Sequence, residues 1–355
     1  MKRSIFVVIA VLLAISMAGC NAGSLTKETP EPTPEAAATP MPGPTPEPPP
    51  ELTPEPTATP EPEPVSYTTG LPFSGEYRPV MVVVENSSAA RPQTGLQTAD
   101  VVYEVPVEGG TTRFVCVFSD TIPESVMPVR SGRVSFLYIQ QEWNAVFMHF
   151  GGSGDGKRSA PSYTFYGNDL YSKVKFDVDG LYDGKYRDFY KRVKGKSAPH
   201  NVEMYPQMAQ QLYDYQPEPL GWLFDAEVSY AGGDGTAVNL KMCTGDRDFV
   251  SYAYDAERDV YLRSMKGKAF KSAETGEQVT VKNVIVQYST YQSKDVYKVW
   301  NMTGGGSADY YIGGKLIKGT WKKDAADSPT VFYDDQGRQI VLRPGNTWIH
   351  IHPEA

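Results

Sequence analysis

The sequence predicts an α/β or α+β N-terminal domain followed by a mainly antiparallel β C-terminal domain. In the first half, apolar runs of strand length at 79–84 and 112–118 are separated by polar loops and one helical segment. In the second half, short β-rich runs alternate with glycine-bearing turns, which is typical of antiparallel hairpins. A proline-rich stretch at 217–219 marks the predicted boundary, giving domains at 66–220 and 221–355.

The N-terminus has the pattern of a secretory signal peptide over residues 1–20. Lys2 and Arg3 precede an apolar run, which ends in Met17-Ala-Gly-Cys20. This ending resembles the bacterial lipobox, whose cysteine is diacylated and becomes the mature N-terminus. Acyl chains at Cys20 would anchor the protein to the lipid membrane on its extracytoplasmic face. A plain transmembrane anchor is the alternative.

Residues 21–65 predict a disordered Pro/Glu/Thr-rich stalk. They hold fifteen of the 29 prolines, one lysine and eight glutamates, with little to bury. Such a segment is extended and semi-rigid, with a reach on the order of 100 Å. This segment carries a formal charge of −7, residues 1–20 carry +2 and residues 66–355 carry only −3, for a net charge of −8. No basic face or known module predicts nucleic-acid binding.

The N-terminal domain is expected to contain four strands and two helices in a fixed order. Strands are predicted at 79–84, 99–104, 112–118 and 146–149, a helix starting from an N-cap at Ser131, and a helix at 206–215 with proline in its first turn. Residues 163–192 are rich in Tyr, Asp, Gly and Lys without periodicity, which indicates an excursion over the surface. Binding and catalytic sites on such sheets usually form at the strand ends, where this sequence has polar residues.

The C-terminal domain is expected to be built from hairpins. The predicted strands are 249–254, 260–263, 279–288, 296–301, 310–312, 315–321, 331–333, 339–342 and 347–351. Cys116 is predicted to be a buried strand thiol. The sequence leaves open whether Cys116 and Cys243 stay reduced or form a disulfide.

Arginines gather at the predicted loops and at the start of the first helix. A helix N-terminus with two arginines and a glycine turn can bind an anion through N–H groups, the helix dipole and guanidinium groups. The predicted ligand-binding residues are Arg91, Arg113, Arg130, Ser131, Arg133, Gly152 and Ser153. Internal pairing of the arginines with carboxylates of the same domain is an equally strong interpretation.

Several residues could serve hydrolytic or transfer chemistry. Ser131 or Ser153 could act as nucleophile with His149 or His200 as base, and Glu104 and Glu108 could take part in acid–base steps. No Gly-x-Ser-x-Gly elbow is present. The run from Gly151 to Arg158 departs from a P-loop, and neither 177–180 nor the 350–352 pair offers enough ligands for a metal. We therefore predict neither metal nor cofactor, and whether the protein is an enzyme stays open.

A string of motifs resembles the YerB-type lipoproteins, a family of secreted two-part proteins. The motifs are Arg78-Pro-Val-Met-Val-Val-Val-Glu-Asn86, Ala90-Arg-Pro-Gln-Thr-Gly-Leu96, Ala99-Asp-Val-Val-Tyr-Glu104, Glu108-Gly-Gly-Thr-Thr-Arg-Phe114, Pro128-Val-Arg-Ser-Gly-Arg133, His149-Phe-Gly-Gly-Ser153, Pro199-His-Asn201, Lys282-Asn-Val-Ile-Val286, Gly319-Thr-Trp-Lys-Lys323 and Pro344-Gly-Asn-Thr-Trp348. The resemblance covers roughly 70–355. It implies two adjacent domains on a lipoprotein mainly of Gram-positive bacteria, and no particular reaction.

Three functions remain open from the sequence. The first is a cell-envelope lipoprotein that binds an anionic wall polymer or a protein partner through the arginine loops. The second is a hydrolase or transferase acting on cell-wall glycan or its phosphate linkages. The third is a scaffold for wall-synthesis proteins.

Overall fold

A computed structural model describes residues 43, 63–243 and 249–353. Cys20, the signal peptide and nearly all of the predicted stalk lie outside the described residues. The part from Pro60 to Ala355 forms one compact unit. Among the residues described, no helix has the length and hydropathy needed to cross a membrane.

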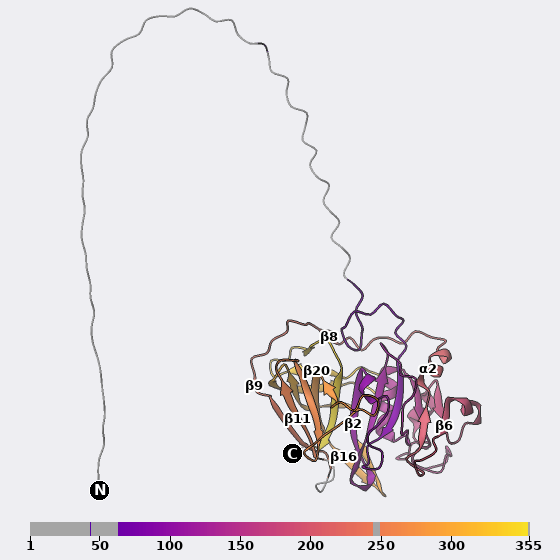
Figure 1. Cartoon of the computed structure of the whole chain (residues 1–355). Helices are drawn as coiled ribbons and strands as arrows, with labels where there is room; N and C mark the ends of the chain where they lie inside the picture. Colours follow the sequence, from indigo (N-terminus) through magenta and orange to yellow (C-terminus); the bar gives the residue numbers. More distant parts are fainter. Residues whose placement is uncertain (1–42, 44–62, 244–248, 354–355) are drawn as a thin grey trace, which may run out of the picture. The chain divides into compact units, whose positions relative to one another are not determined.

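The unit is built on a large mixed sheet, and this sheet contains strands from both halves of the chain (Figure 1). Ten strands follow one another in the order β20-β19-β18-β15-β22-β2-β3-β1-β4-β5, and β9 pairs with β19. Their bounds are β1 Val80–Glu85, β2 Val101–Val107, β3 Thr111–Phe118, β4 Val146–His149, β5 Asp177–Asp179, β9 Gly233–Asp234, β15 Asn283–Ser289, β18 Gly304–Ile312, β19 Lys315–Lys323, β20 Val331–Asp334 and β22 Thr347–Pro353.

The last strand, β22, joins the two halves of this sheet. It lies parallel to β15 on one side and parallel to β2 on the other, with Ile349 opposite both Ile285 and Tyr103. The strands beyond β15 are antiparallel hairpin partners, as the sequence predicts. Because one sheet runs through both halves, the boundary near residue 220 stays a prediction.

Both faces of the central strands are buried, which explains their uninterrupted apolar sequences. On β1, Val80, Val82 and Val84 belong to one core, while Met81 and Val83 belong to another. Helix α1 (Val134–Trp143) covers the second core. A smaller antiparallel sheet contributes Leu240, Val250 and Tyr252, among others, to the first core. Strand alternation thus distributes side chains between two layers that sandwich the large sheet.

The smaller sheet and several short elements complete the fold. The small sheet contains β10 (Ala237–Lys241), β11 (Phe249–Asp255), β12 (Val260–Met265), β13 (Lys268–Ala269) and β14 (Thr280–Val281). Three two-stranded ribbons pair β6 (Tyr190–Arg192) with β7 (Val202–Met204), β8 (Leu223–Phe224) with β21 (Val341–Leu342), and β16 (Tyr291–Lys294) with β17 (Tyr297–Trp300). Short 3-10 segments are η1 (Leu96–Thr98), η2 (Glu108–Gly110), η3 (Asp169–Lys173), η4 (Gly184–Phe189) and η5 (Gln210–Leu212).

The predicted fold class is confirmed, with three local differences. The helix predicted at 206–215 is one turn, α2 (Pro206–Ala209), continued by η5. The predicted excursion at 163–192 is partly core, since Phe165, Tyr166 and Tyr186 are buried. Ser131 is not the N-cap of α1, because Arg133 occupies that position without a side-chain cap and the Ser131 hydroxyl donates to the Phe150 carbonyl.

Candidate functional site

The chain brings five of the predicted site residues together beside the ends of β1, β2 and β3. The loop after β3 returns along β1, where the Arg130 N–H donates to the Val83 carbonyl at 2.9 Å. Arg113, at the start of β3, donates from Nη1 to the Ser131 carbonyl at 3.0 Å. Arg133, which ends the same loop, reaches Glu108 of η2. The structure therefore brings these residues together, and their role as a binding site stays a prediction.

Glu108 is the internal partner of two of these arginines. Its Oε2 accepts from Arg133 Nε at 2.9 Å, its Oε1 accepts from Arg133 Nη2, and Arg113 Nη2 lies 3.5 Å away. Burial alone would raise the pKa of Glu108, but the hydrogen bonds and charge of Arg133 and the charge of Arg113 lower it to about 2. The pairing leaves Arg133 only 8% exposed. Internal pairing thus accounts for both guanidinium groups.

Arg130 and His200 share another carboxylate, that of Glu85 at the end of β1. His200 Nδ1 lies 2.8 Å from Oε2, and Arg130 Nε lies 3.6 Å from the same oxygen. The Ser87 hydroxyl donates to Oε1 at 2.8 Å. Glu85 is buried, while about a quarter of each basic side chain is exposed, at 25% for Arg130 and 24% for His200. This trio ties the 200 loop to the large sheet.

His149 is enclosed at the end of β4. Its Nε2 lies 2.6 Å from Asp177 Oδ1, and its Nδ1 lies 2.8 Å from the Gly151 carbonyl. Burial would lower the pKa of His149, but the charge and hydrogen bond of Asp177, with the charge of Asp179, raise it to about 9. At neutral pH the imidazolium donates from both nitrogens and has no lone pair to accept a proton. Its environment is that of a structural cation.

The glycine turn that follows His149 is shaped by packing. The Ser153 hydroxyl accepts from the Phe165 N–H at 2.8 Å. A Cβ on Gly152 would come within 2.5 Å of the Phe165 ring. Gly151 has a φ of 72° and donates its N–H to Asp179 Oδ1 at 2.9 Å. The turn is therefore closed by Phe165 and Asp179.

Glu104 is fully buried in a charged cluster that the sequence analysis did not identify. Its Oε2 accepts from Arg263 Nη2 of β12 at 2.8 Å and lies 3.3 Å from His350 Nδ1 of β22. Burial would raise the pKa of Glu104, but the charge of Arg263, with the contribution of His350, lowers it to about 2. The burial and the low pKa make it a poor general base. Arg263 also lies over the Trp348 ring, 4.5 Å from its centroid.

Arg91 differs from the other predicted arginines because it borders open pockets. Its Nε donates to Asn86 Oδ1 at 3.0 Å, and its guanidinium lies 6.0 Å from the Phe270 ring. Two pockets, of about 370 and 280 Å³, share Arg91 and Lys266. Their other lining residues are Pro92, Met265, Lys268, Ala269, Phe270 and Lys271 in the larger pocket, and Ser87, Ser88, Gly109, Gly110 and Thr111 in the smaller one. We call the two together the lysine groove.

Among the described residues, the lining of the lysine groove has four cationic residues and no carboxylate. Lys266, Lys268 and Lys271 are exposed, and their side chains make no ion pair with any residue in the described ranges. The turn between β12 and β13 presents the first two, with Lys266 at a φ of 52° and Gly267 at 69°. These lysines were not among the predicted site residues, although three lysines within six residues at a hairpin turn indicate a local cluster of positive charge.

Comparison with known proteins defines the class to which this fold and these motifs belong. Residues 68–217 match the protein of unknown function (DUF3048) N-terminal domain, and residues 238–349 match the DUF3048 C-terminal domain. The chain belongs to this two-part family, as the resemblance to YerB-type proteins implied.

One relative is a Bacillus subtilis (strain 168) protein named "Putative lipoprotein YerB". It is 30% identical over 288 residues, which cover 79% of this chain and 82% of the relative. The crystal structure of YerB from Bacillus subtilis superposes with a TM-score of 0.68 at 28% identity, covering 82% of this chain and 97% of that chain. The printed name of this relative describes a type of protein and states no reaction.

Proposed function

We propose that this protein is a membrane-anchored lipoprotein of the cell envelope that binds an anionic wall polymer through the lysine groove. The main observation is the charge of the groove, whose lining holds three exposed lysines that make no ion pair within the described residues. Exposed lysines without a counter-charge in the described chain attract external anions, and the attraction is strongest where several share one concave surface.

The shape of the groove supports a chain-like ligand. The two pockets meet at Arg91 and Lys266, so a ligand could extend from one into the other while it stays close to both cations. Phe270 and Met265 add apolar area beneath the charged rim. Arg91 is held by Asn86, so its charge is positioned before any ligand arrives. A polymer with repeated phosphate or carboxylate groups matches this arrangement.

The location at the cell envelope rests on the N-terminal sequence and the relative. Cys20 follows Ala18 and Gly19 as in a lipobox, and the proline-rich segment 21–65 would hold the folded part away from the membrane. The related protein from Bacillus subtilis is itself named a lipoprotein. A wall polymer would be within reach of a domain placed in this way.

The experiment compares polyanion binding by two triple variants of equal charge. Full-length protein is purified in detergent and titrated with polyglycerol-phosphate teichoic acid, with neutral dextran as the control ligand. Lys266, Lys268 and Lys271 are changed to Gln in one variant. The matched control changes the exposed lysines Lys173, Lys194 and Lys294 to Gln; within the described part of the chain these also lack an ion pair.

We expect the groove variant to lose most of its affinity and the control variant to keep it. Equal losses in both would show that only net charge matters and would contradict a localised site. Unchanged binding in the groove variant would contradict the proposal directly. Thermal unfolding midpoints of both variants check that the substitutions leave the fold intact.

A further inference from the structure

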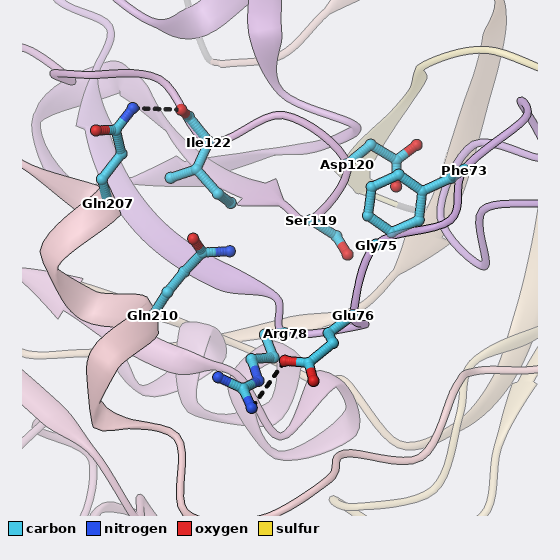
Figure 2. A pocket seen from close by; sticks show the side chains of 9 residues that line it. All are labelled: Phe73, Gly75, Glu76, Arg78, Ser119, Asp120, Ile122, Gln207 and Gln210. Carbon is cyan, nitrogen blue, oxygen red and sulfur yellow. Dashed lines mark hydrogen bonds and ion pairs between the residues drawn. The ribbon is translucent and has the colours of Figure 1, made fainter.

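A further pocket, which the predicted site does not include, is lined in part by residues 73–78, near the start of the described range 63–243. It measures about 500 Å³, within the range of about 300–1,000 Å³ usual for small-molecule sites. Figure 2 shows its walls: the 73–78 segment, the loop after β3, and the α2–η5 turn. The lining residues are Phe73, Gly75, Glu76, Arg78, Ser119, Asp120, Ile122, Gln207 and Gln210. We call it the junction pocket.

A smaller pocket of about 140 Å³ adjoins the junction pocket. The two share Phe73, Gly75, Ser119 and Asp120, and the smaller one adds the rings of Tyr67 and Tyr77. Tyr67 is 57% exposed and packs edge-to-face against Tyr77, with ring centroids 5.5 Å apart. The combined space therefore has aromatic rings at one end and polar side chains at the other.

Buried polar atoms in these walls have no hydrogen-bond partner among the described residues. They are the Ser119 hydroxyl and the Tyr77 hydroxyl, from residues only 3% and 4% exposed, together with Arg78 Nε. Most buried polar groups in folded proteins are paired, because an unpaired one costs free energy. Their concentration along one pair of pockets points to a hydrogen-bonding ligand.

The lining is polar, and its one arginine is paired with a carboxylate of the same lining. Arg78 Nη2 pairs with Glu76 Oε2 at 2.8 Å, as Figure 2 shows. Asp120 already accepts from the hydroxyls of Ser66, Thr68 and Thr69, at 2.6, 3.0 and 2.5 Å. These neutral donors leave Asp120 with its negative charge, which disfavours an anionic ligand, and the other polar groups of the lining are hydroxyls and amides. The lysine groove, by contrast, presents three exposed lysines to a ligand.

We propose that the junction pocket binds a neutral saccharide unit. Sugar hydroxyls both donate and accept, so they can pair with the Ser119 and Tyr77 hydroxyls and with the Gln210 amide. The apolar face of a sugar ring can pack on Phe73 or Tyr67, because aromatic rings offer apolar area beside polar groups. In Figure 2 the Gln210 side chain extends from its helical turn toward the space that Ser119 borders.

The test measures saccharide binding to the full-length protein by calorimetry. The protein is held in a detergent without a sugar headgroup, and the probes are tetra-N-acetylglucosamine, cellotetraose and inorganic polyphosphate. Ser119→Ala removes a hydroxyl that has no partner within the described chain, so it should leave the thermal midpoint unchanged. Gln210→Ala removes an amide at the other wall. Gln292→Ala, on exposed β16, is the matched control.

We expect at least one tetrasaccharide to bind, with about tenfold weaker binding in Ser119→Ala and in Gln210→Ala and no change in Gln292→Ala. Polyphosphate should not compete. Absence of saccharide binding at millimolar concentration would overturn the proposal and would leave water as the partner of the unpaired groups. Equal binding in all variants, or competition by polyphosphate, would also overturn it. The lysine-groove triple variant should bind the saccharide normally, so failure of one site is distinguishable from failure of the other.

Discussion

Arg263 of β12 and Glu104 of β2 form a fully buried ion pair between the small sheet and the large sheet. Nη2 and Oε2 lie 2.8 Å apart, and neither side chain is exposed. The family matches place the two residues in different parts of the chain, Glu104 in the first and Arg263 in the second. Tyr252 receives a hydrogen bond from Arg263 Nη1 at 2.7 Å and lies 2.9 Å from His350 Nε2. The pair therefore ties the two parts together.

Breaking this pair from one side should be costly. We expect Arg263→Met to lower the free energy of unfolding by about 3–5 kcal/mol, because Glu104 would be left buried without its counter-charge. The double variant Glu104→Leu, Arg263→Met should recover part of that loss. Urea denaturation gives the three values. A single-variant loss below about 1 kcal/mol would show that the pair is not what holds the sheets together.

Glu108 predicts an acid-sensitive contribution to stability. Its pKa falls from 4.5 to about 2 on folding, so the carboxylate stabilises the fold above pH 4.5, and this contribution is lost as the pH falls toward 2. The full contribution is up to about 3 kcal/mol. Glu108→Gln should flatten the curve of unfolding free energy between pH 4.5 and 2, measured by urea denaturation. An unchanged slope in that variant would contradict the assigned pKa.

His149 predicts the opposite dependence. Its pKa rises from 6.5 to about 9 on folding, so its stabilisation is complete below pH 6.5 and is lost as the pH rises through 9. The loss amounts to about 3 kcal/mol. His149→Gln should remove the pH dependence between 6.5 and 9, and it should make the protein less stable at pH 6. NMR titration of the imidazole gives the pKa independently; a value near 6.5 would rule this account out.

Strands and helices were easier to predict from the sequence than the pairing between distant strands, and the reason is physical. Apolar runs and turn residues act locally, so strands such as 80–85 and the helix at 134–143 are readable from composition and spacing. The parallel placement of β22 between β15 and β2 depends on contacts between residues more than 60 positions apart. No local pattern encodes such a pairing.

The same limit applies to the side chains of the candidate site. Arginines at strand ends were identifiable, but their pairing with Glu108 or Glu85 needed the fold. One signal for the buried cluster was present: along β12, Tyr261, Arg263 and Met265 share the buried face. A charged residue at an inward position of an alternating strand requires a buried counter-charge. Glu104, in an apolar strand, fits that requirement.

Polyanion binding at the lysine groove should depend strongly on salt. Exposed cations such as Lys266, Lys268 and Lys271 are screened over a Debye length of about 8–10 Å at physiological ionic strength. We expect affinity for teichoic acid to fall steeply between about 0.05 and 0.2 M NaCl, because more competing ions screen the groove. The groove variant should show a shallower dependence than the variant at Lys173, Lys194 and Lys294. Saccharide binding at the junction pocket should not change over the same range, because a neutral saccharide carries no charge for salt to screen. Calorimetry at four salt concentrations with both ligands makes the comparison, and parallel slopes for the two lysine variants would mean that the groove is not the anion site.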